Sequence, residues 1–244
     1  MPDMTRTLEI LAAMQSVWAA LVVTVVFAGL ARRVRGVTFG GAVAGAVVCF
    51  LLYWGAGFGA FVALVSVFVL TWVSTRFGYR RKETLGTAER RDGRTALQVL
   101  ANLAVAASCA ALSALTGKAV FLLAISAALS EAAADTVSSE LGQARSTSAR
   151  LITTWEAVPA GTDGGVSWVG TLAGIGAASV VSVMGVATGL ISLRRLGVSI
   201  MAAVAGMIGD SLLGALLERR RLLNNDGVNL LGTVIAAAAA SLLA

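Results

Sequence analysis

The amino-acid sequence predicts an all-α fold, a polytopic integral membrane helical bundle of about eight transmembrane helices with short loops. Hydrophobic residues make up 57% of the 244 residues and charged residues 13%, whereas soluble globular chains are about 25% charged. The mean hydropathy of +0.85 agrees with a membrane protein. Most of the apolar segments reach the roughly 17–25 residues that a helix needs to span a bilayer. We therefore expect residues 1–244 to form a single transmembrane domain.

Eight apolar segments follow one another along the chain. The second and third are short, and the turn Trp54–Gly57 between them predicts a tight hairpin that serves as scaffold. In chain order the expected segments are Leu8–Ala31, Val37–Trp54, Phe58–Ser74, Thr95–Thr116, Ala119–Leu141, Val166–Leu190, Leu196–Leu217 and Val228–Leu243.

The basic residues predict the orientation. If the loops alternate between two sides, one side receives only Arg6, Lys118, Arg194 and Arg195, and the other receives the remaining 15 of the 19 lysines and arginines. By the positive-inside rule the richer side faces the cytoplasm, so both termini are expected outside the cell membrane. Topology and anionic lipid headgroups account for the net charge of +6. We therefore expect a membrane partner and no nucleic acid.

Several kinds of chemistry are excluded by composition. The chain has no histidine, which excludes His-ligated zinc and His-based acid–base catalysis. Its two cysteines, Cys49 and Cys109, both lie in apolar segments and match no metal-binding spacing. No Walker A sequence occurs, so ordinary P-loop nucleotide binding is also excluded.

The most informative stretch is Ser130–Gly142, which reads SEAAADTVSSELG directly after an apolar run. Carboxylates at the end of a membrane helix are costly and usually functional. This stretch contains three of them, Glu131, Asp135 and Glu140, together with the hydroxyls of Thr136 and Ser139.

A second stretch, Met207–Leu217, repeats the pattern of aspartate followed by a hydroxyl residue, here Asp210 and Ser211. Both stretches lie on helices that run from outside to inside, so Asp135 and Asp210 are expected at the same depth near the cytoplasmic surface. Mg²⁺ is typically held by one or two carboxylates plus substrate phosphates. The alternative is a pair of buried acids satisfied by arginines or amides.

Further polar groups are expected on the same face. In the loop 75–94, Arg90 and Arg94 are candidate phosphate ligands, while Lys82 is either such a ligand or a topology anchor. Gln98 and Asn102 lie one helical turn apart on one face, where they either join helices or reach a polar ligand.

Two more loops complete the expected site. The glycine-rich loop before the sixth apolar segment can turn backbone amides toward an anion, and Ser167 after it is a candidate helix cap. A polar cluster follows the seventh segment. The candidates in these two loops are Gly161, Thr162, Asp163, Gly164, Asn225, Asp226 and Asn229.

These motifs together resemble a family of uncharacterised integral membrane proteins that includes the plant phytyl-phosphate kinase, with the polyprenol and phytol kinases as more distant relatives. The resemblance covers most of the chain after about Val37. It is carried by GRxxxQVxAN, ADTxxSELG, PxGTDGGVS, DSLLG and NNDxVN, which begin at residues 93, 134, 159, 210 and 224. The resemblance implies phosphoryl transfer from a nucleoside triphosphate, with CTP expected, to an isoprenyl monophosphate.

We accordingly predict a membrane-embedded prenyl-phosphate kinase with Mg²⁺ as its cofactor. Asp135, Asp210 and Arg94 are the predicted catalytic residues, and the two aspartates are the predicted metal ligands. The predicted substrate- and nucleotide-binding residues are Lys82, Arg90, Gln98, Asn102, Glu131, Thr136, Ser139, Glu140, Gly161, Thr162, Asp163, Gly164, Ser211, Asn225, Asp226 and Asn229. The alternatives are a transporter or flippase of a phosphorylated isoprenoid lipid and a non-catalytic assembly protein, and a homo-oligomer is left open.

Overall fold

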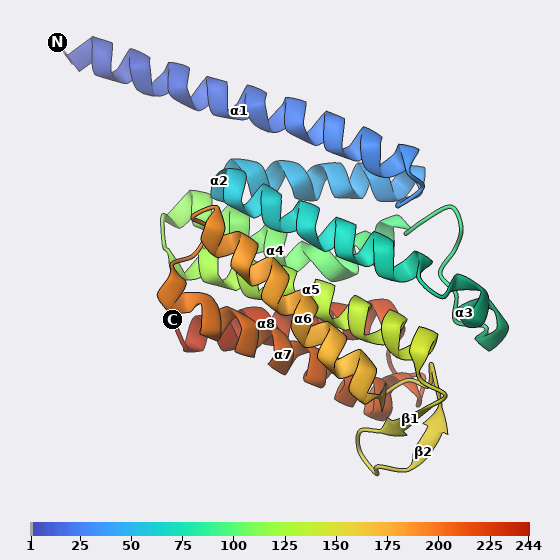
Figure 1. Cartoon of the computed structure of the whole chain (residues 1–244). Helices are drawn as coiled ribbons and strands as arrows, with labels where there is room; N and C mark the ends of the chain where they lie inside the picture. Colours follow the sequence, from blue (N-terminus) through green and yellow to red (C-terminus); the bar gives the residue numbers. More distant parts are fainter. Residues whose placement is uncertain (1) are drawn as a thin grey trace.

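The computed structural model describes the backbone of residues 2–244 and the side chains of residues 17–244. Each of the eight predicted apolar segments is helical, and Figure 1 shows the long helices side by side in one bundle. Within the described residues, five helices are long and apolar enough to cross a membrane: α2, α4, α5, α6 and α7 with its extension. The helices are α1 (Pro2–Arg33), α2 (Phe39–Arg76), α3 (Tyr79–Leu85), α4 (Ala96–Thr116), α5 (Val120–Arg145), α6 (Trp168–Ala187), α7 (Leu196–Leu213) and α8 (Asn225–Leu242).

Helix α2 contains the predicted hairpin. At Gly57 the backbone has φ 74° and ψ −165°, a conformation open to glycine and costly for other residues. Both ends of α2 lie near the end of α1, because Trp72 Nε1 donates to Val34 O at 3.2 Å, only four residues before the N-cap Thr38. The chain therefore reverses at Gly57, and α2 supplies two of the eight predicted segments.

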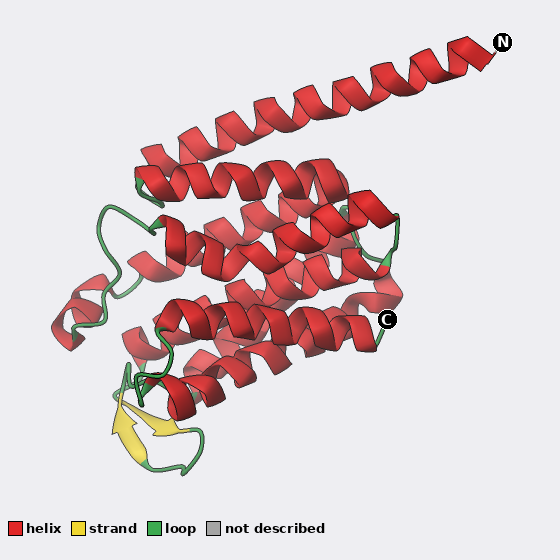
Figure 2. Cartoon of the chain, turned by 180° about the vertical axis from the view of Figure 1, so that it is seen from behind, coloured by secondary structure: helices red, strands yellow, loops and turns green. Residues whose placement is uncertain are grey.

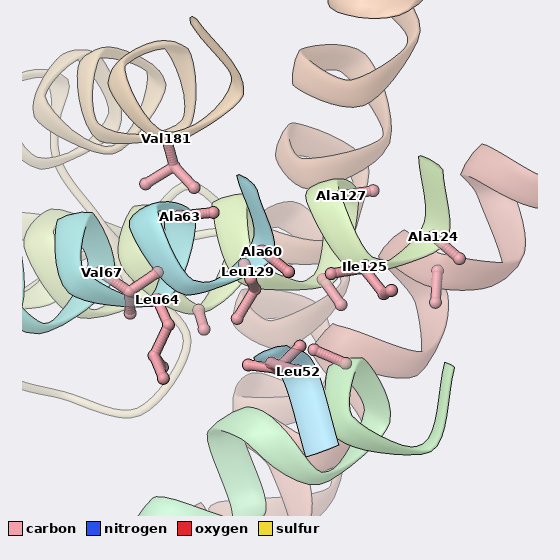
Figure 3. Close-up of a cluster of buried hydrophobic side chains, with 14 of the residues drawn as sticks. Leu52, Ala60, Ala63, Leu64, Val67, Ala124, Ile125, Ala127, Leu129 and Val181 are labelled. Atoms are coloured by element: carbon pink, nitrogen blue, oxygen red, sulfur yellow. The ribbon is translucent and has the colours of Figure 1, made fainter. Parts of the chain in front are cut away.

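Helix α5 lies at the centre of the bundle. In its most apolar 18-residue window 78% of the residues are buried, against 33–39% in the other four candidate spans. Figure 3 shows Ile125 and Leu129 of α5 packed among side chains from both halves of α2. Residues on α5 are therefore enclosed by protein, which is where carboxylates in a membrane protein can be accommodated.

Buried hydroxyls also join α5 to its neighbours. Ser130 bonds Ser182 at 2.8 Å, and Ser199 bonds both Ser182 and Ser126 at 2.9 Å. All four side chains are fully buried. Small residues and interhelical hydroxyl bonds are the usual means of close helix packing in membranes, and here they fix α5, α6 and α7 at mid-bundle.

Helix α1 is the outermost helix and packs mainly against α2, as Figures 1 and 2 show from opposite sides. Its contact is aromatic: the Phe27 ring meets the rings of Phe61 and Phe68 edge-on, at centroid distances of 5.7 and 5.5 Å. The opposite face exposes apolar side chains such as Val25 and Val26, as expected of a helix that faces lipid.

Two connections carry more structure than the predicted short loops. Between α2 and α4 the short helix α3 forms. Between α5 and α6 a small antiparallel sheet of order β2-β1-β3 forms from β1 (Ser148–Leu151), β2 (Ala157–Pro159) and β3 (Gly165–Val166). Figure 1 shows α3 and the sheet at one end of the bundle, opposite the start of α1 and the end of α8. The predicted loops with most of the basic residues therefore share one end.

Candidate functional site

Asp135 on α5 and Asp210 on α7 line the same cavity, near enough for their carboxyl groups to interact. Glu131, one turn earlier on α5, lies beside them: a Cβ placed on Gly232 would be 2.5 Å from Glu131 Oε1 and 3.4 Å from Asp210 Cβ. The two aspartates thus meet as the sequence predicts, and a third carboxylate adjoins them.

Two of these carboxylate oxygens lack a partner. Among the described side chains, Glu131 Oε1 and Asp210 Oδ2 are buried without a hydrogen bond. Buried polar atoms are normally paired, and an exception points to an ion, a water or a function. Carboxylate oxygens are the ligands that Mg²⁺ takes in proteins, so the chemistry of this group fits a magnesium ion completed by substrate phosphates. No group of three or more acidic or cysteine residues within residues 17–244 could hold a metal by itself.

The aspartates line a cavity of about 170 Å³, here called the polar cavity. It lies between the C-terminal ends of α5 and α7, the loop before α6 and the start of α8. Its lining residues are Asp135, Ser138, Ser139, Gly142, Gln143, Ala149, Ala160, Gly161, Thr162, Asp163, Gly164, Gly165, Val166, Ser167, Asp210, Ser211, Gly214, Glu218 and Asn225.

The glycine-rich loop is held against α7 by backbone contact. The Gly165 amide donates to Thr162 O at 2.8 Å and closes a turn. Gly164 has φ +73°, and a Cβ at this position would lie 2.6 Å from Ala215 Cα. Ser167 caps α6 by accepting from the Gly170 amide at 3.1 Å, as predicted. The loop and the two aspartates therefore line the same cavity.

Arg94 reaches the same acids from the other side. Its backbone is fixed to the α1–α2 turn, because Thr38 N donates to Arg94 O at 2.9 Å and Arg94 N donates to Gly36 O at 3.1 Å. Its guanidinium Nη2 donates to Thr136 Oγ1 at 3.3 Å. Consecutive helix residues do not face the same way, but Asp135 also feels the charge of Arg94. The cation therefore lies near the acidic pair and stabilises negative charge there.

A second cavity of about 290 Å³, here called the apolar cavity, also includes Arg94 in its wall. It lies between α1, both halves of α2 and α4. Its lining residues are Phe27, Ala28, Ala31, Arg35, Gly36, Val37, Gly41, Ala42, Gly45, Leu64, Val67, Phe68, Thr71, Trp72, Thr75, Arg76, Tyr79, Glu89, Arg90, Arg91, Gly93, Arg94, Gln98, Val99, Asn102, Leu103 and Ala132.

With this geometry established, comparison with known proteins places the chain in a family. Residues 22–237 match the integral membrane protein family DUF92. The chain belongs to this family. It is 33% identical over 221 residues to an uncharacterised membrane protein of Methanocaldococcus jannaschii (89% of this chain, 90% of the relative). It is 31% identical over 250 residues to the chloroplastic protein VTE6 of Arabidopsis thaliana (96% of this chain, 75% of the relative). No solved structure matches.

Membership of an integral membrane family confirms the predicted fold class. The match covers the two aspartates, Arg94 and the glycine-rich loop, so the two cavities lie within the part that defines the family. An uncharacterised membrane protein of a Synechocystis strain is also 34% identical over 196 residues, 78% of this chain and 76% of the relative.

The remaining candidates divide between the two cavities. Arg90, Gln98 and Asn102 line the apolar cavity rather than the one that holds the aspartates. Gln98 forms a capping box with Thr95, as its Oε1 accepts from the Thr95 amide at 2.8 Å. The sequence therefore predicts one convergent site where the structure has two separate cavities with no lining residue in common among those described.

Arg90 lies at the exposed rim of the apolar cavity. It pairs with Asp92 through Nε and Oδ1 at 3.1 Å. This hydrogen bond lowers the pKa of Asp92 from its usual value. Both side chains are exposed, so the pair contributes little to stability, and Arg90 can exchange Asp92 for another anion.

Lys82 occupies a different place from the one predicted. It is fully buried and forms an ion pair with Glu140, and its ammonium group also donates to Thr75 O at 2.7 Å and Ser74 O at 3.1 Å. An ammonium group has three protons, so all of its donors are engaged. In this structure Lys82 and Glu140 join α3 to α5 and line neither cavity.

Other candidates also lie outside the polar cavity. Asp226 and Asn229 on α8 line neither cavity, whereas Asn225 lines the polar one. Ser139 and Ser211 do line it, but their hydroxyls donate to carbonyls of their own helices, at 3.2 and 3.3 Å.

Among the polar side chains that line the polar cavity, the sequence did not single out Ser138, Gln143 and Glu218. Gln143 Oε1 is buried without a partner among the described side chains. Gln143 lies two turns beyond Asp135 on α5, a position that helical spacing could have indicated had the predicted helix not ended at Leu141. Glu218 belongs to a π-helical turn, Gly214–Glu218, which continues α7 and carries no sequence signal of its own.

Proposed function

We propose that the protein is a prenyl-phosphate kinase that transfers the terminal phosphoryl group of a nucleoside triphosphate, with CTP expected, to an isoprenyl monophosphate. The observation that carries this proposal is the meeting of Asp135 and Asp210 in one cavity with a glycine-rich loop and near Arg94. The resemblance to the family of the plant phytyl-phosphate kinase, and the similarity to VTE6 over 96% of this chain and 75% of that relative, support the same activity.

Asp135 and Asp210 would hold Mg²⁺ together with the phosphates of the nucleotide, and the ion would neutralise phosphate charge there. The polar cavity, at about 170 Å³, is smaller than the roughly 300–1,000 Å³ of complete ligand pockets. It therefore suits the phosphate groups, while the sugar and base lie outside it near Asn225 and the loop.

The reaction requires no strong base. An oxygen of the acceptor monophosphate forms a bond to the terminal phosphorus of the nucleotide, and the bond from that phosphorus to its bridging oxygen breaks. The products are a prenyl diphosphate and a nucleoside diphosphate. The acceptor is already anionic, so a chain without histidine can catalyse the transfer by positioning and charge neutralisation. Arg94 stabilises the charge that is shared between acceptor and donor.

The proposal also places the site at the cytoplasmic face of the cell membrane, with both termini outside. The support is the clustering of basic loops at the end of the bundle that carries the aspartates. Nucleoside triphosphates are available on that side.

The test is turnover by purified protein with Mg²⁺, radiolabelled CTP and geranylgeranyl monophosphate. We expect labelled diphosphate from the wild type and none from Asp135→Asn or Asp210→Asn. The matched control is Glu156→Gln, which removes an exposed carboxylate in the β1–β2 turn. Full turnover by both aspartate variants would refute the assignment. Movement of the lipid across proteoliposomes without nucleotide, with no diphosphate formed, would replace the kinase by a transporter.

A further inference from the structure

The apolar cavity combines two surfaces of opposite character. Its wall toward the middle of the bundle consists of apolar side chains from α1, α2 and α4, including Phe27, Leu64 and Leu103. Its other end, near the basic loops, is lined by four arginines besides Arg94. These are Arg35, Arg76, Arg90 and Arg91.

These arginines differ in how far they are engaged. Arg76 stacks on Trp72 with 4.1 Å to the ring centroid and donates to Val34 O at 2.8 Å. Arg91 is paired with Glu83 at 3.0 Å on the surface. Arg94 is half-buried and, among the described residues, its side chain donates to the hydroxyl of Thr136 alone. Arg94 is therefore the cation best placed to receive an anion at the inner edge of the cavity.

An apolar chamber with cations at one end is complementary to an anionic amphiphile. Along α2 the lining runs from Arg76 to Leu64, which is about 18 Å at 1.5 Å per residue. The chamber is thus an elongated space that extends from the charged end into the bundle. A linear hydrocarbon chain with a phosphate at one end matches both its shape and its charge.

The location of Arg94 relates this cavity to the acidic pair. Arg94 lines the apolar cavity and also bonds Thr136, the neighbour of Asp135. Asp135, which lines the polar cavity, also feels the charge of Arg94. A phosphate held at Arg94 with its tail in the apolar cavity would therefore lie near Asp135. The two cavities provide separate places for two substrates whose reacting groups must meet.

We propose that the apolar cavity binds the isoprenoid tail of the acceptor, with the monophosphate at Arg94, and that Phe27, Leu64 and Leu103 at its inner end limit the tail length. This inference rests on the proposed function. Helix α1 packs mainly against α2 and forms the outer wall of the cavity.

Gly45 provides a direct test. It lines the cavity, and a Cβ placed on it would meet no atom within 4 Å, so a larger side chain would enter the open space without a backbone clash. Glycine is also a poor helix residue compared with leucine, so Gly45→Leu is expected to fold. Gly29 on α1 is the matched control, because its Cβ would likewise meet nothing within 4 Å but it is exposed and lies outside the cavity.

The experiment measures turnover on dimethylallyl, geranyl and geranylgeranyl monophosphate, with binding of each acceptor followed separately by thermal shift without nucleotide. Gly45→Leu should weaken binding and turnover of geranylgeranyl monophosphate by roughly tenfold to hundredfold. The leucine side chain would occupy space that the long tail needs, so either the side chain or the tail must move. Dimethylallyl monophosphate should be unaffected, and Gly29→Leu should behave as the wild type.

The outcomes separate this inference from the proposed function. If the wild type turns over and Gly45→Leu keeps the same chain-length profile, the tail lies elsewhere and the inference is wrong while the kinase stands. If no acceptor is phosphorylated but Gly45→Leu still abolishes the thermal shift by the long acceptor, the cavity assignment stands and the kinase assignment falls. A wild type that shows no shift with any acceptor would refute the tail-binding cavity.

Discussion

The buried pair of Lys82 and Glu140 provides a sharp prediction, because the sequence leaves Lys82 as either a phosphate ligand or a topology anchor, whereas the structure buries it in an ion pair. Lys82 is fully buried and the Glu140 side chain is 10% exposed. The change Glu140→Ala leaves the ammonium group with two backbone carbonyls, those of Ser74 and Thr75, in place of its anion.

The expected cost follows from that loss. Removing one partner of a buried ion pair typically costs about 3–5 kcal/mol, because the remaining charge is uncompensated. The two carbonyls still solvate Lys82, so the low end applies, about 3 kcal/mol. For a chain of this size that lowers the melting temperature by roughly 6–12 °C. Replacing both partners by apolar residues, as in Lys82→Met with Glu140→Leu, should restore most of the stability.

The assay is thermal unfolding in detergent for Glu140→Ala, Lys82→Met and the double variant, with turnover measured on each at a temperature where all are folded. The exposed pair serves as control, and Asp92→Ala should leave the melting temperature unchanged. The structure predicts that the double variant keeps its turnover. An undiminished melting temperature in Glu140→Ala, together with lost turnover in Lys82→Met, would show that Lys82 contacts phosphate and that the anchoring interpretation is wrong.

Two further predictions concern close approaches at the site. Gly164 and Gly86 have nearly the same φ, +73° and +74°. A Cβ at Gly164 would collide with Ala215, whereas at Gly86 it would meet nothing within 4 Å. Gly164→Ala should therefore weaken nucleotide binding, measured by calorimetry, and Gly86→Ala should share only the left-handed backbone strain of about 1–2 kcal/mol. Equal losses in both would refute a special role for the loop contact. Gly232→Ala would place Cβ 2.5 Å from Glu131 Oε1, whereas a Cβ at Gly176 on α6 would enter open space. Gly232→Ala should therefore lower turnover more than Gly176→Ala. Equal turnover of the two variants would show that the position of Glu131 is not constrained.

Much of the scaffold could be predicted because it depends on composition. The apolar segments are long enough to identify singly, and the glycines around Gly57 indicate a reversal without tertiary information. The meeting of Asp135 and Asp210 could also be predicted, since two helices running in the same direction with acids near their ends place those acids at one level. These features follow from residues near in sequence and from the thickness of the bilayer.

Other features depend on contacts between distant residues, and the sequence alone does not indicate them. Lys82 and Glu140 are 58 residues apart, and nothing in either neighbourhood marks them as partners. The strands β1, β2 and β3 have two to four residues each, too few to show an alternating pattern. The candidates separate into two cavities because residues from the segment 89–94 line the apolar cavity together with α2 and α4. The aspartates instead line the polar cavity together with the loop before α6.

The central claim is that Asp135 and Asp210 together hold one divalent ion on the nucleotide phosphates. Its most direct test replaces Mg²⁺ by Mn²⁺ and measures bound Mn²⁺ by electron paramagnetic resonance, with a non-hydrolysable CTP analogue present. We predict that the wild type and Glu156→Gln bind the ion, with coupling to phosphorus, and that Asp135→Asn and Asp210→Asn each lose it. Unchanged Mn²⁺ binding in both aspartate variants would contradict the account.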